Sequence, residues 1–265
     1  KEGHMLVFLP GVGEITRAEE LLSDLNGVDV MPLHGRMKLA DQERALAPSR
    51  RRKVILSTNI AESAVTIEGV RAVVDSGLVR QSRFEPTLGF SRLELVRISQ
   101  ASADQRAGRA GRTGPGRCVR VWSSSEHQRM PPFDPPEIGR SDMSGPFLEL
   151  LAWGNNPDTF SWFDPPKQSY LEQARQLLEN LKLIEEGRIS KLGQEAMTLP
   201  LHPRLASFVL CCSQQGLARR AVTVAALLSE PDVFRRTPKG NDACDIELRL
   251  NLIESFEANP RNTRE

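Results

Sequence analysis

Short, continuous hydrophobic runs alternate with segments of helical period through the first 75 residues of the chain. Runs of this kind, bounded by Pro, Gly or Asn, are typical of strands buried on both faces of a parallel sheet. Apolar residues three and four positions apart are typical of helices that pack on one side. The pattern predicts strands at 5–9, 28–33, 53–57 and 70–74 and helices at 15–25 and 39–46. This alternation predicts an α/β fold whose mainly parallel sheet carries helices on both faces.

The pattern changes between residues 79 and 98, where polar and apolar side chains alternate in two segments. Residues 79–84 and 91–98 each show the period of two that is typical of a half-exposed strand, and Pro and Gly lie between them. We therefore predict an antiparallel hairpin whose outward face is rich in arginine. Residues 119–122 predict a last strand of the main sheet.

A proline-rich segment at 130–136, Met-Pro-Pro-Phe-Asp-Pro-Pro, cannot form regular structure and marks a boundary. Beyond it the chain is mostly helical. A helix over 170–184, a turn at 186–190 and a short following helix predict a small winged-helix unit, after which a helical bundle segment is expected. The expected domains are 1–125 for the sheet domain, 126–197 for a linker and the winged helix, and 198–265 for the helical segment, which could be truncated.

Composition and charge argue against nucleic-acid binding through overall charge, against a cysteine metal site and against a membrane-spanning protein. Hydrophobic residues make up 39% of the sequence, and the formal net charge of +1 gives no global attraction to nucleic acid. Binding of that kind would need local basic surface, for which the arginines at 50–53 and 106–120 are candidates. The four cysteines have no metal-ligand spacing, which predicts inert thiols in a reducing compartment and no metal site. No apolar run reaches the ~18–20 residues of a membrane span, so we expect a cytoplasmic protein without a membrane partner.

Candidate chemistry is concentrated at 105–112, which reads Gln-Arg-Ala-Gly-Arg-Ala-Gly-Arg. If this segment is one helix, Gln105, Arg109 and Arg112 lie on one face within about 60° of one another, and Arg106 points about 100° away from Gln105. Two guanidinium groups on one face suit an anion whose charge is spread over several oxygens, such as a phosphoryl group in transfer.

The alternative for this segment is an ordinary solvated basic helix. Gly108 and Gly111 argue against that alternative, because each glycine inside a helix costs about 1 kcal/mol relative to alanine. Residues without a side chain instead allow another backbone or a ligand to approach closely.

Three segments resemble the conserved motifs of one family. Residues 6–15, Leu-Val-Phe-Leu-Pro-Gly-Val-Gly-Glu-Ile, are similar to helicase motif IV, and residues 56–67, Leu-Ser-Thr-Asn-Ile-Ala-Glu-Ser-Ala-Val-Thr-Ile, resemble motif V. Residues 105–112, continuing Thr-Gly-Pro-Gly, resemble motif VI. Together they look like the second RecA-like domain of a DEAH-box helicase of superfamily 2, and residues 8–15 and 199–206 look most like its HrpB branch. The hairpin, winged-helix and helical segments follow the order of that family, so the resemblance covers essentially the whole chain.

The resemblance implies one half of an ATP site. Arg109 and Arg112 would be arginine fingers that reach the β- and γ-phosphates across a cleft, and Gln105 would orient the phosphate or the attacking water. An arginine finger contributes about 10³–10⁵ in rate. Thr66 and Glu68 would lie near the ribose, although most relatives have Asp where this chain has Glu68.

The resemblance also implies a track for a single strand of nucleic acid. Thr58, Asn59 and the main-chain N–H of Gly11 would hold backbone phosphates, contacts that position a strand without reading its sequence. The hairpin at 79–98 would act as a wedge or strand guide. Many relatives have Thr where this chain has Pro10, so one hydroxyl donor is lost. The alternative for Thr58 and Asn59 is ordinary loop capping.

Essential parts of a helicase ATP site are missing from the sequence. It contains no Gly-x-x-x-x-Gly-Lys-Ser/Thr loop and no Asp-Glu-Ala-His segment. We expect the chain to be an internal or C-terminal piece of a longer ATP-dependent helicase that acts on RNA rather than DNA, with the N-terminal RecA-like domain of the same protein preceding Lys1. ATP and Mg²⁺ would bind the full-length enzyme, and this piece alone would bind neither and be inactive. The competing hypothesis is a non-catalytic nucleic-acid-binding or partner-docking module.

Overall fold

The computed structural model describes residues 3–63, 66–86, 89–112, 114–230 and 245–258. Part of the predicted hairpin turn, residues 87–88, lies outside this range, as does Cys244. The chain forms two compact units, Lys1–Ser141 and Asp142–Glu265. The limits of the three domains expected from the sequence stay predictions.

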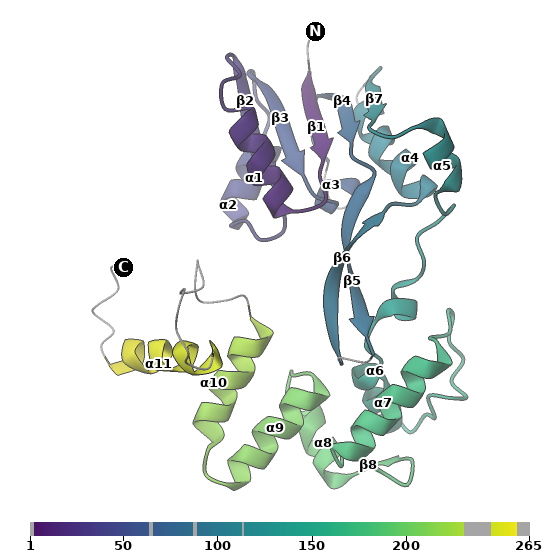
Figure 1. Cartoon of the computed structure of the whole chain (residues 1–265), viewed down its shortest axis with the longest axis vertical. Helices are drawn as coiled ribbons and strands as arrows, with labels where there is room; N and C mark the ends of the chain where they lie inside the picture. The colour runs from purple at the N-terminus through teal and green to yellow at the C-terminus, as the bar shows by residue number, and fades with distance from the viewer. Residues whose placement is uncertain (1–2, 64–65, 87–88, 113, 231–244, 259–265) are drawn as a thin grey trace. The chain divides into compact units, whose positions relative to one another are not determined.

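A five-stranded parallel sheet forms the centre of the first unit (Figure 1). The unit contains the strands β1 (His4–Phe8), β2 (Val28–Leu33), β3 (Arg52–Ser57), β4 (Val70–Asp75), β5 (Leu78–Glu85), β6 (Phe90–Arg97) and β7 (Arg117–Arg120), the helices α1 (Val12–Leu21), α2 (Leu39–Leu46), α3 (Ile60–Ser63), α4 (Gln100–Gly108) and α5 (Ser124–Arg129), and the 3-10 turns η1 (Arg109–Gly111) and η2 (Glu137–Arg140). The spatial order in the sheet is β2-β3-β1-β4-β7, and every neighbouring pair is parallel. The predicted α/β fold with a parallel sheet is therefore confirmed.

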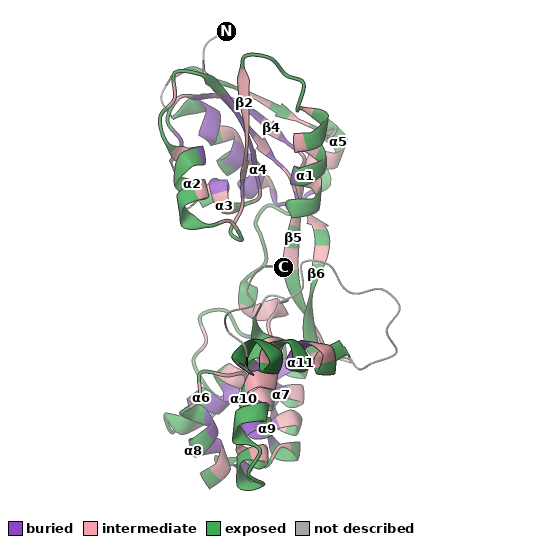
Figure 2. Ribbon diagram, turned by 90° about the vertical axis from the view of Figure 1, so that its left-hand side faces the viewer, coloured by how far each residue is buried: buried purple, intermediate pink, exposed green. Residues whose placement is uncertain are grey.

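The two faces of the sheet carry separate hydrophobic clusters. Val54 and Leu56 of β3 pack on one face with Ile15 of α1. The alternate residue of β3, Ile55, packs on the opposite face with Phe8 of β1, beside small residues of α2 and α3. Figure 2 shows the buried strands between helices whose outer sides are exposed. Because both faces are covered, the central strands β1 and β3 carry uninterrupted apolar runs, which is the pattern that predicted them.

Lys53, in the basic run 50–53, lies inside the first unit. It is only 4% exposed, and its Nζ donates hydrogen bonds to the carbonyls of Arg44, Ala45 and Ala47 at 3.0, 3.1 and 2.6 Å. Those carbonyls belong to the last turn of α2, whose oxygens have no partner within the helix. Desolvation lowers the pKa of Lys53. This cation caps a helix and is not available to nucleic acid.

Strands β5 and β6 form the predicted antiparallel hairpin, but the prediction of one arginine-rich face is wrong. Arg83 and Arg92 lie directly opposite each other on one face, whereas Arg80 and Arg97 point to the other, because side chains alternate along a strand. Each arginine also has a carboxylate partner, and the pairs are Arg80–Glu14, Arg83–Glu94, Arg92–Glu85, Arg92–Glu94 and Arg97–Glu126. The hairpin therefore presents neutralised charge on both faces.

The second unit is mainly helical. It contains α6 (Ser144–Ala152), α7 (Gln168–Asn180), β8 (Ile184–Glu185), β9 (Arg188–Ile189), α8 (Lys191–Met197), α9 (Pro203–Gln214), α10 (Ala218–Ser229) and α11 (Asp245–Ala258). Helix, antiparallel hairpin and helix follow one another as expected, and Gly193 of α8 lies so close to the hairpin that a Cβ there would be 2.1 Å from the Leu183 carbonyl. That these elements form a winged helix, and that the later helices form a bundle, stays a prediction.

A polar link joins the beginnings of α6 and α9 in this unit. Nε2 of His202 lies 2.9 Å from Oδ2 of Asp142 and 3.0 Å from Oγ of Ser144. Nδ1 of His202 accepts the main-chain N–H of Arg204, so this ring nitrogen carries no proton and Nε2 is the donor. His202 thus connects two helices and caps one of them, which is a structural role.

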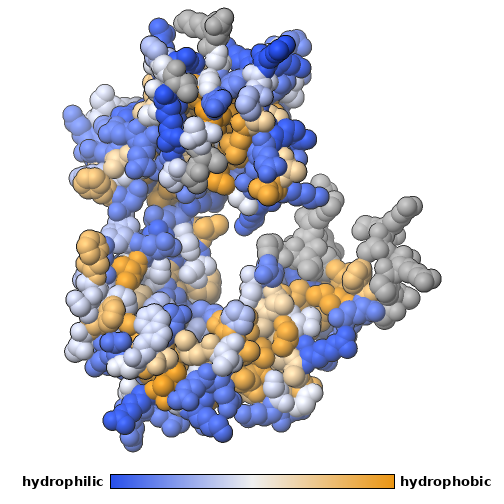
Figure 3. Space-filling model, turned by 180° about the vertical axis from the view of Figure 1, so that it is seen from behind, coloured by the Kyte–Doolittle hydropathy of each residue, from blue (hydrophilic) through white to orange (hydrophobic). Residues whose placement is uncertain are grey.

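Apolar side chains also remain on the surface of the second unit (Figure 3). Large exposed hydrophobic residues on or beside α9, α10 and α11 are Phe208, Leu217, Val222, Leu228, Leu252 and Phe256. Part of the apolar surface of these helices is therefore not packed within the described residues. In the same described part of the chain, no helix has the length and apolar character that crossing a membrane requires.

Candidate nucleotide and nucleic-acid site

The parallel sheet brings the predicted strand-binding residues to one edge. β1 and β3 are neighbours, with Phe8 in register with Ser57, so the segments after both strands leave the sheet at its carboxyl edge. Gly11 begins α1 there, and Thr58 and Asn59 follow β3. Thr58 is half-buried, and its N–H donates to the Leu33 carbonyl at 3.2 Å, whereas Asn59 is exposed. The three residues thus lie on adjacent segments, and their contact with nucleic acid stays a prediction.

A charged pair that the sequence did not reveal lies against Gly11. Arg80 of the hairpin bonds Glu14 of α1 at 2.9 Å, and a Cβ on Gly11 would be 2.7 Å from Nε of Arg80. The hydrogen bond from Arg80 lowers the pKa of Glu14. Because these two residues are 66 positions apart, no local pattern could have indicated the contact. It places a guanidinium beside the main-chain N–H that is expected to hold a phosphate.

The single helix predicted for 105–112 is wrong. α4 ends at Gly108, and the 3-10 turn η1 follows at Arg109–Gly111. Gly116, just before β7, fits closely behind this turn, since a Cβ there would be 2.0 Å from the Ala110 carbonyl oxygen. As a result, Gln105 on α4 is exposed, Arg109 is buried at 8% exposure, and Arg112 is exposed. The three side chains do not form the uniform face that a continuous helix would give.

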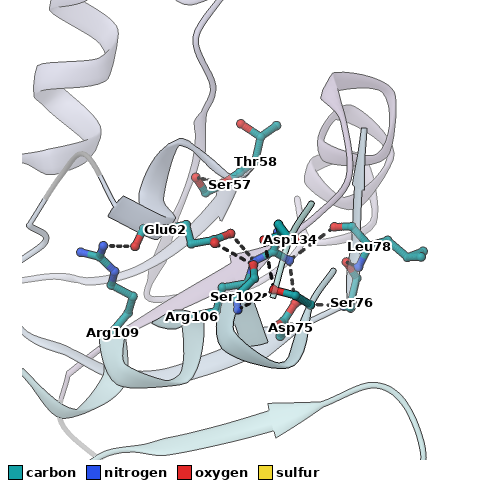
Figure 4. A network of polar contacts seen from close by, with 12 residues as sticks. Ser57, Thr58, Glu62, Asp75, Ser76, Leu78, Ser102, Arg106, Arg109 and Asp134 are labelled. Carbon is teal, nitrogen blue, oxygen red and sulfur yellow. Dashed lines mark hydrogen bonds and ion pairs between the residues drawn. The ribbon is translucent and has the colours of Figure 1, made fainter. Parts of the chain in front are cut away.

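The structure does bring parts of motifs V and VI together. Nη1 of Arg112 donates to Oγ1 of Thr66 at 2.6 Å, and both residues are exposed. Arg109 donates to the main-chain carbonyl of Glu62 (Figure 4). Desolvation and the nearby charge of Arg112 lower the pKa of Arg109. Glu68, expected near the ribose, is exposed two residues beyond Thr66.

Arg106, beside these arginines, is fully buried. Its Nε lies 2.9 Å from a carboxylate oxygen of Glu62, and its Nη1 lies 2.9 Å from Oδ1 of Asp75 (Figure 4). Its guanidinium also lies over the Phe8 ring, 4.8 Å from the ring centroid. Removing one partner of such a buried pair costs about 3–5 kcal/mol, because a charge is then left uncompensated. The helical period predicted that Arg106 points away from Gln105, but nothing in the sequence indicated that Glu62 and Asp75 are its partners.

Two glycines of the arginine segment face open space. Apart from chain neighbours and the helix's own backbone, no atom of the described residues lies within 4 Å of the position that a Cβ would take at Gly108 or Gly111, and both glycines are exposed. Gly108 also has ordinary helical angles, with φ −59° and ψ −20°. No contact among the described residues therefore requires a glycine at either position.

The donor set of this segment suits the phosphates of a nucleotide. Arg109, Arg112 and the Thr66 hydroxyl provide cations and a polar group near one another, which fit part of a triphosphate. Across the described ranges, no group of three or more His, Cys, Asp and Glu side chains is arranged to hold a metal ion.

Comparison with known proteins gives consistent matches. Residues 1–114 match the helicase conserved C-terminal domain. The ATP-dependent RNA helicase HrpB of Escherichia coli is 44% identical over 236 residues, which are 87% of this chain and 29% of that protein. The mouse protein named probable ATP-dependent RNA helicase DHX34 is 36% identical over 98% of this chain and 23% of its own length. A crystal structure of the Escherichia coli DEAH/RHA helicase HrpB aligns with a TM-score of 0.84 and 39% identity over 97% of this chain and 34% of that one. The chain thus spans about a quarter to a third of these relatives.

Proposed function

Because the chain belongs to the DEAH-box family of ATP-dependent RNA helicases and carries its C-terminal helicase domain, we propose that it is one half of the motor of such an enzyme. In this proposal Arg109 and Arg112 contact the phosphates of ATP, Gln105 orients the phosphate or the attacking water, and Thr66 and Glu68 approach the ribose. ATP and Mg²⁺ would be held chiefly by an N-terminal RecA-like domain of the same cytoplasmic protein.

One observation carries the proposal. Gly108 and Gly111 are exposed and face open space beside Arg109 and Arg112, so a second surface can approach the backbone there. The transition state of phosphoryl transfer is stabilised by positive groups in fixed positions, and the protein takes little covalent part in the reaction. Two guanidinium groups beside an accessible backbone can provide such positive groups. Closure of the two lobes around ATP would complete the site, and reopening would move the strand.

The substrate of this motor would be a single strand of RNA. The names of the relatives point to RNA, and Gly11, Thr58 and Asn59 lie on neighbouring segments at one edge of the sheet. Main-chain N–H, hydroxyl and amide donors suit backbone phosphates and give little sequence preference. Base identity would therefore contribute little to binding.

The test uses the full-length protein with Arg109→Ala, Arg112→Ala and, as a matched control, Arg117→Ala, which removes an exposed arginine at the start of β7. We expect each of the first two changes to lower RNA-stimulated ATP hydrolysis by about 10³-fold. RNA affinity should stay within about threefold, since the strand site lies elsewhere on the sheet.

Two results would contradict this assignment. Equal loss of hydrolysis and RNA affinity would mean that the arginines hold the strand, and an unchanged rate would remove them from the ATP site. A full-length protein that binds RNA without hydrolysing ATP would support the alternative of a binding module. The 265-residue chain alone should not turn over ATP.

A further inference from the structure

The short helix α3 lies between the two proposed sites. It begins immediately after Thr58 and Asn59 and spans only Ile60–Ser63. The N–H of Glu62 donates to the carbonyl of Asn59 at 2.9 Å, so the exposed end of the strand-binding loop is bonded directly to Glu62. A movement of Asn59 on binding a phosphate would therefore change the position of Glu62.

Glu62 also contacts α4 and η1 at three points. Its carboxylate accepts hydrogen bonds from Oγ of Ser102 at 2.6 Å and from Nε of Arg106 at 2.9 Å. Its main-chain carbonyl accepts a hydrogen bond from Arg109. Figure 4 shows these bonds converging on Glu62 from α4 and η1. One residue thus connects the strand-binding loop to an arginine that is proposed to contact ATP.

The other end of this network, at Arg106 and Asp75, is fully buried and hydrogen-bonded. Arg106 is held by Asp75, which is completely buried at the end of β4, and it also donates to the Leu78 carbonyl at 3.4 Å. The carboxylate of Asp75 accepts the main-chain N–H of Gly77 as well. The Glu62 side chain, by contrast, is 17% exposed and stands on a helix of a single turn. Of the two carboxylates around Arg106, Glu62 is therefore the less buried one and the one that stands on the shorter element.

We propose that Glu62 is a positioning residue that transmits occupancy of the strand site by RNA to Arg109, a role that rests on the proposed function. RNA phosphate at Thr58 and Asn59 shifts α3, and the carboxylate and carbonyl of Glu62 then shift Arg106 and Arg109 together. Chains of hydrogen-bonded and ion-paired side chains are a physical route for such coupling. RNA would thereby increase the rate of hydrolysis without touching ATP.

The test measures coupling in the full-length protein with Glu62→Gln and Arg106→Lys. Glutamine keeps the length of the side chain and the main-chain carbonyl but removes the charge, and lysine keeps the charge but cannot contact both carboxylates. We expect the ratio of RNA-stimulated to RNA-free hydrolysis to fall about tenfold in each variant, within the usual range of coupling between sites. RNA affinity should change less than about threefold, because Thr58 and Asn59 are retained.

Two further variants separate coupling from a merely structural role. Asp104→Asn removes an exposed carboxylate of α4 that pairs with Arg120, so it should leave the stimulation ratio unchanged. The double variant Glu62→Gln/Arg106→Lys should lose no more stimulation than the more impaired single variant, since both changes break the same link.

The outcomes distinguish this proposal from the proposed function. If the unaltered protein is stimulated by RNA and Glu62→Gln retains that stimulation, the role of Glu62 is refuted and the motor assignment stands. Losses that multiply in the double variant would also refute it. If the unaltered protein shows no RNA-stimulated hydrolysis, both proposals are overturned.

Discussion

Lys53 and Arg106 are buried cations of the first unit, and both are surrounded by oxygen atoms. Lys53 contacts three carbonyls at the end of α2, and Arg106 contacts the carboxylates of Glu62 and Asp75. A buried charge is stable only when it is paired or hydrogen-bonded in this way. Each cation therefore fixes the segments around it.

The role of Lys53 leads to a prediction about stability. Lys53→Met should lower the free energy of unfolding by about 1–3 kcal/mol, because helix carbonyls lose their donor in a place that water hardly reaches. Denaturant unfolding of the purified chain measures this difference. The control is Arg50→Met, which changes an exposed residue of the same basic run and should alter stability by less than about 0.5 kcal/mol. Equal effects of both variants would contradict the capping role.

Neither buried cation could be recognised from the sequence. The basic run at 50–53 reads as exposed surface, and Arg106 reads as one of several arginines in a motif. Their burial depends on partners distant in the chain, such as Asp75, which is 31 positions from Arg106. By contrast, motif resemblance placed Arg112 and Thr66 in one ATP site; the two side chains are hydrogen-bonded, and their role at ATP stays a prediction.

At the scale of elements, the periodic pattern was most informative where helices and strands are buried against the sheet. It predicted the strand at 28–33 and the helix at 39–46 with the limits that the structure shows. It did not predict the break at Gly108, because that break coincides with the close fit of Gly116 behind η1. The order of the strands also depends on contacts across the sheet that no local pattern contains.

The link between α6 and α9 leads to a prediction about pH. Burial of Asp142 opposes its ionisation, but hydrogen bonds with His202 and Ser144 outweigh this effect and lower the pKa of Asp142 below its ordinary value. The folded state therefore binds fewer protons than the unfolded state around that pKa. The stabilisation is present above about pH 4 and is lost as the pH falls through the lower folded-state pKa.

Asp142→Asn should therefore lower the free energy of unfolding by about 1–3 kcal/mol at neutral pH, since a charge-assisted hydrogen bond is lost. The difference from the unaltered chain should shrink as the pH is lowered from about 5 to about 3. Unfolding curves at several pH values measure it. A difference that is constant over this range would show that the ionised carboxylate is not the stabilising form.

At the scale of the whole molecule, we expect a substitution at Gly108 to have opposite effects on stability and on ATP hydrolysis. Gly108→Ala should raise the stability of the isolated chain by about 0.5–1 kcal/mol, because the residue is helical and the added methyl group meets no atom. In the full-length protein the same methyl group should lower RNA-stimulated ATP hydrolysis, because it occupies the space that the second lobe is proposed to enter.

Gly145 provides the matched control for this prediction. It lies in α6 of the second unit, and a Cβ there would also meet no atom within 4 Å. Gly145→Ala should leave hydrolysis unchanged. Equal losses of hydrolysis in both alanine variants would mean that the glycines of the arginine segment have no special function.

The ion pairs of Arg106 also have a consequence for the folding of this domain during translation. The carboxylate partners of Arg106 are 44 and 31 positions earlier in the chain, so both are translated well before the cation that neutralises them. A nascent chain that has emerged only as far as β4 would have to bury Asp75 without a counter-charge, at a cost that such a fragment could hardly meet. The loop that is expected to hold RNA would therefore mature only once the arginine segment has emerged.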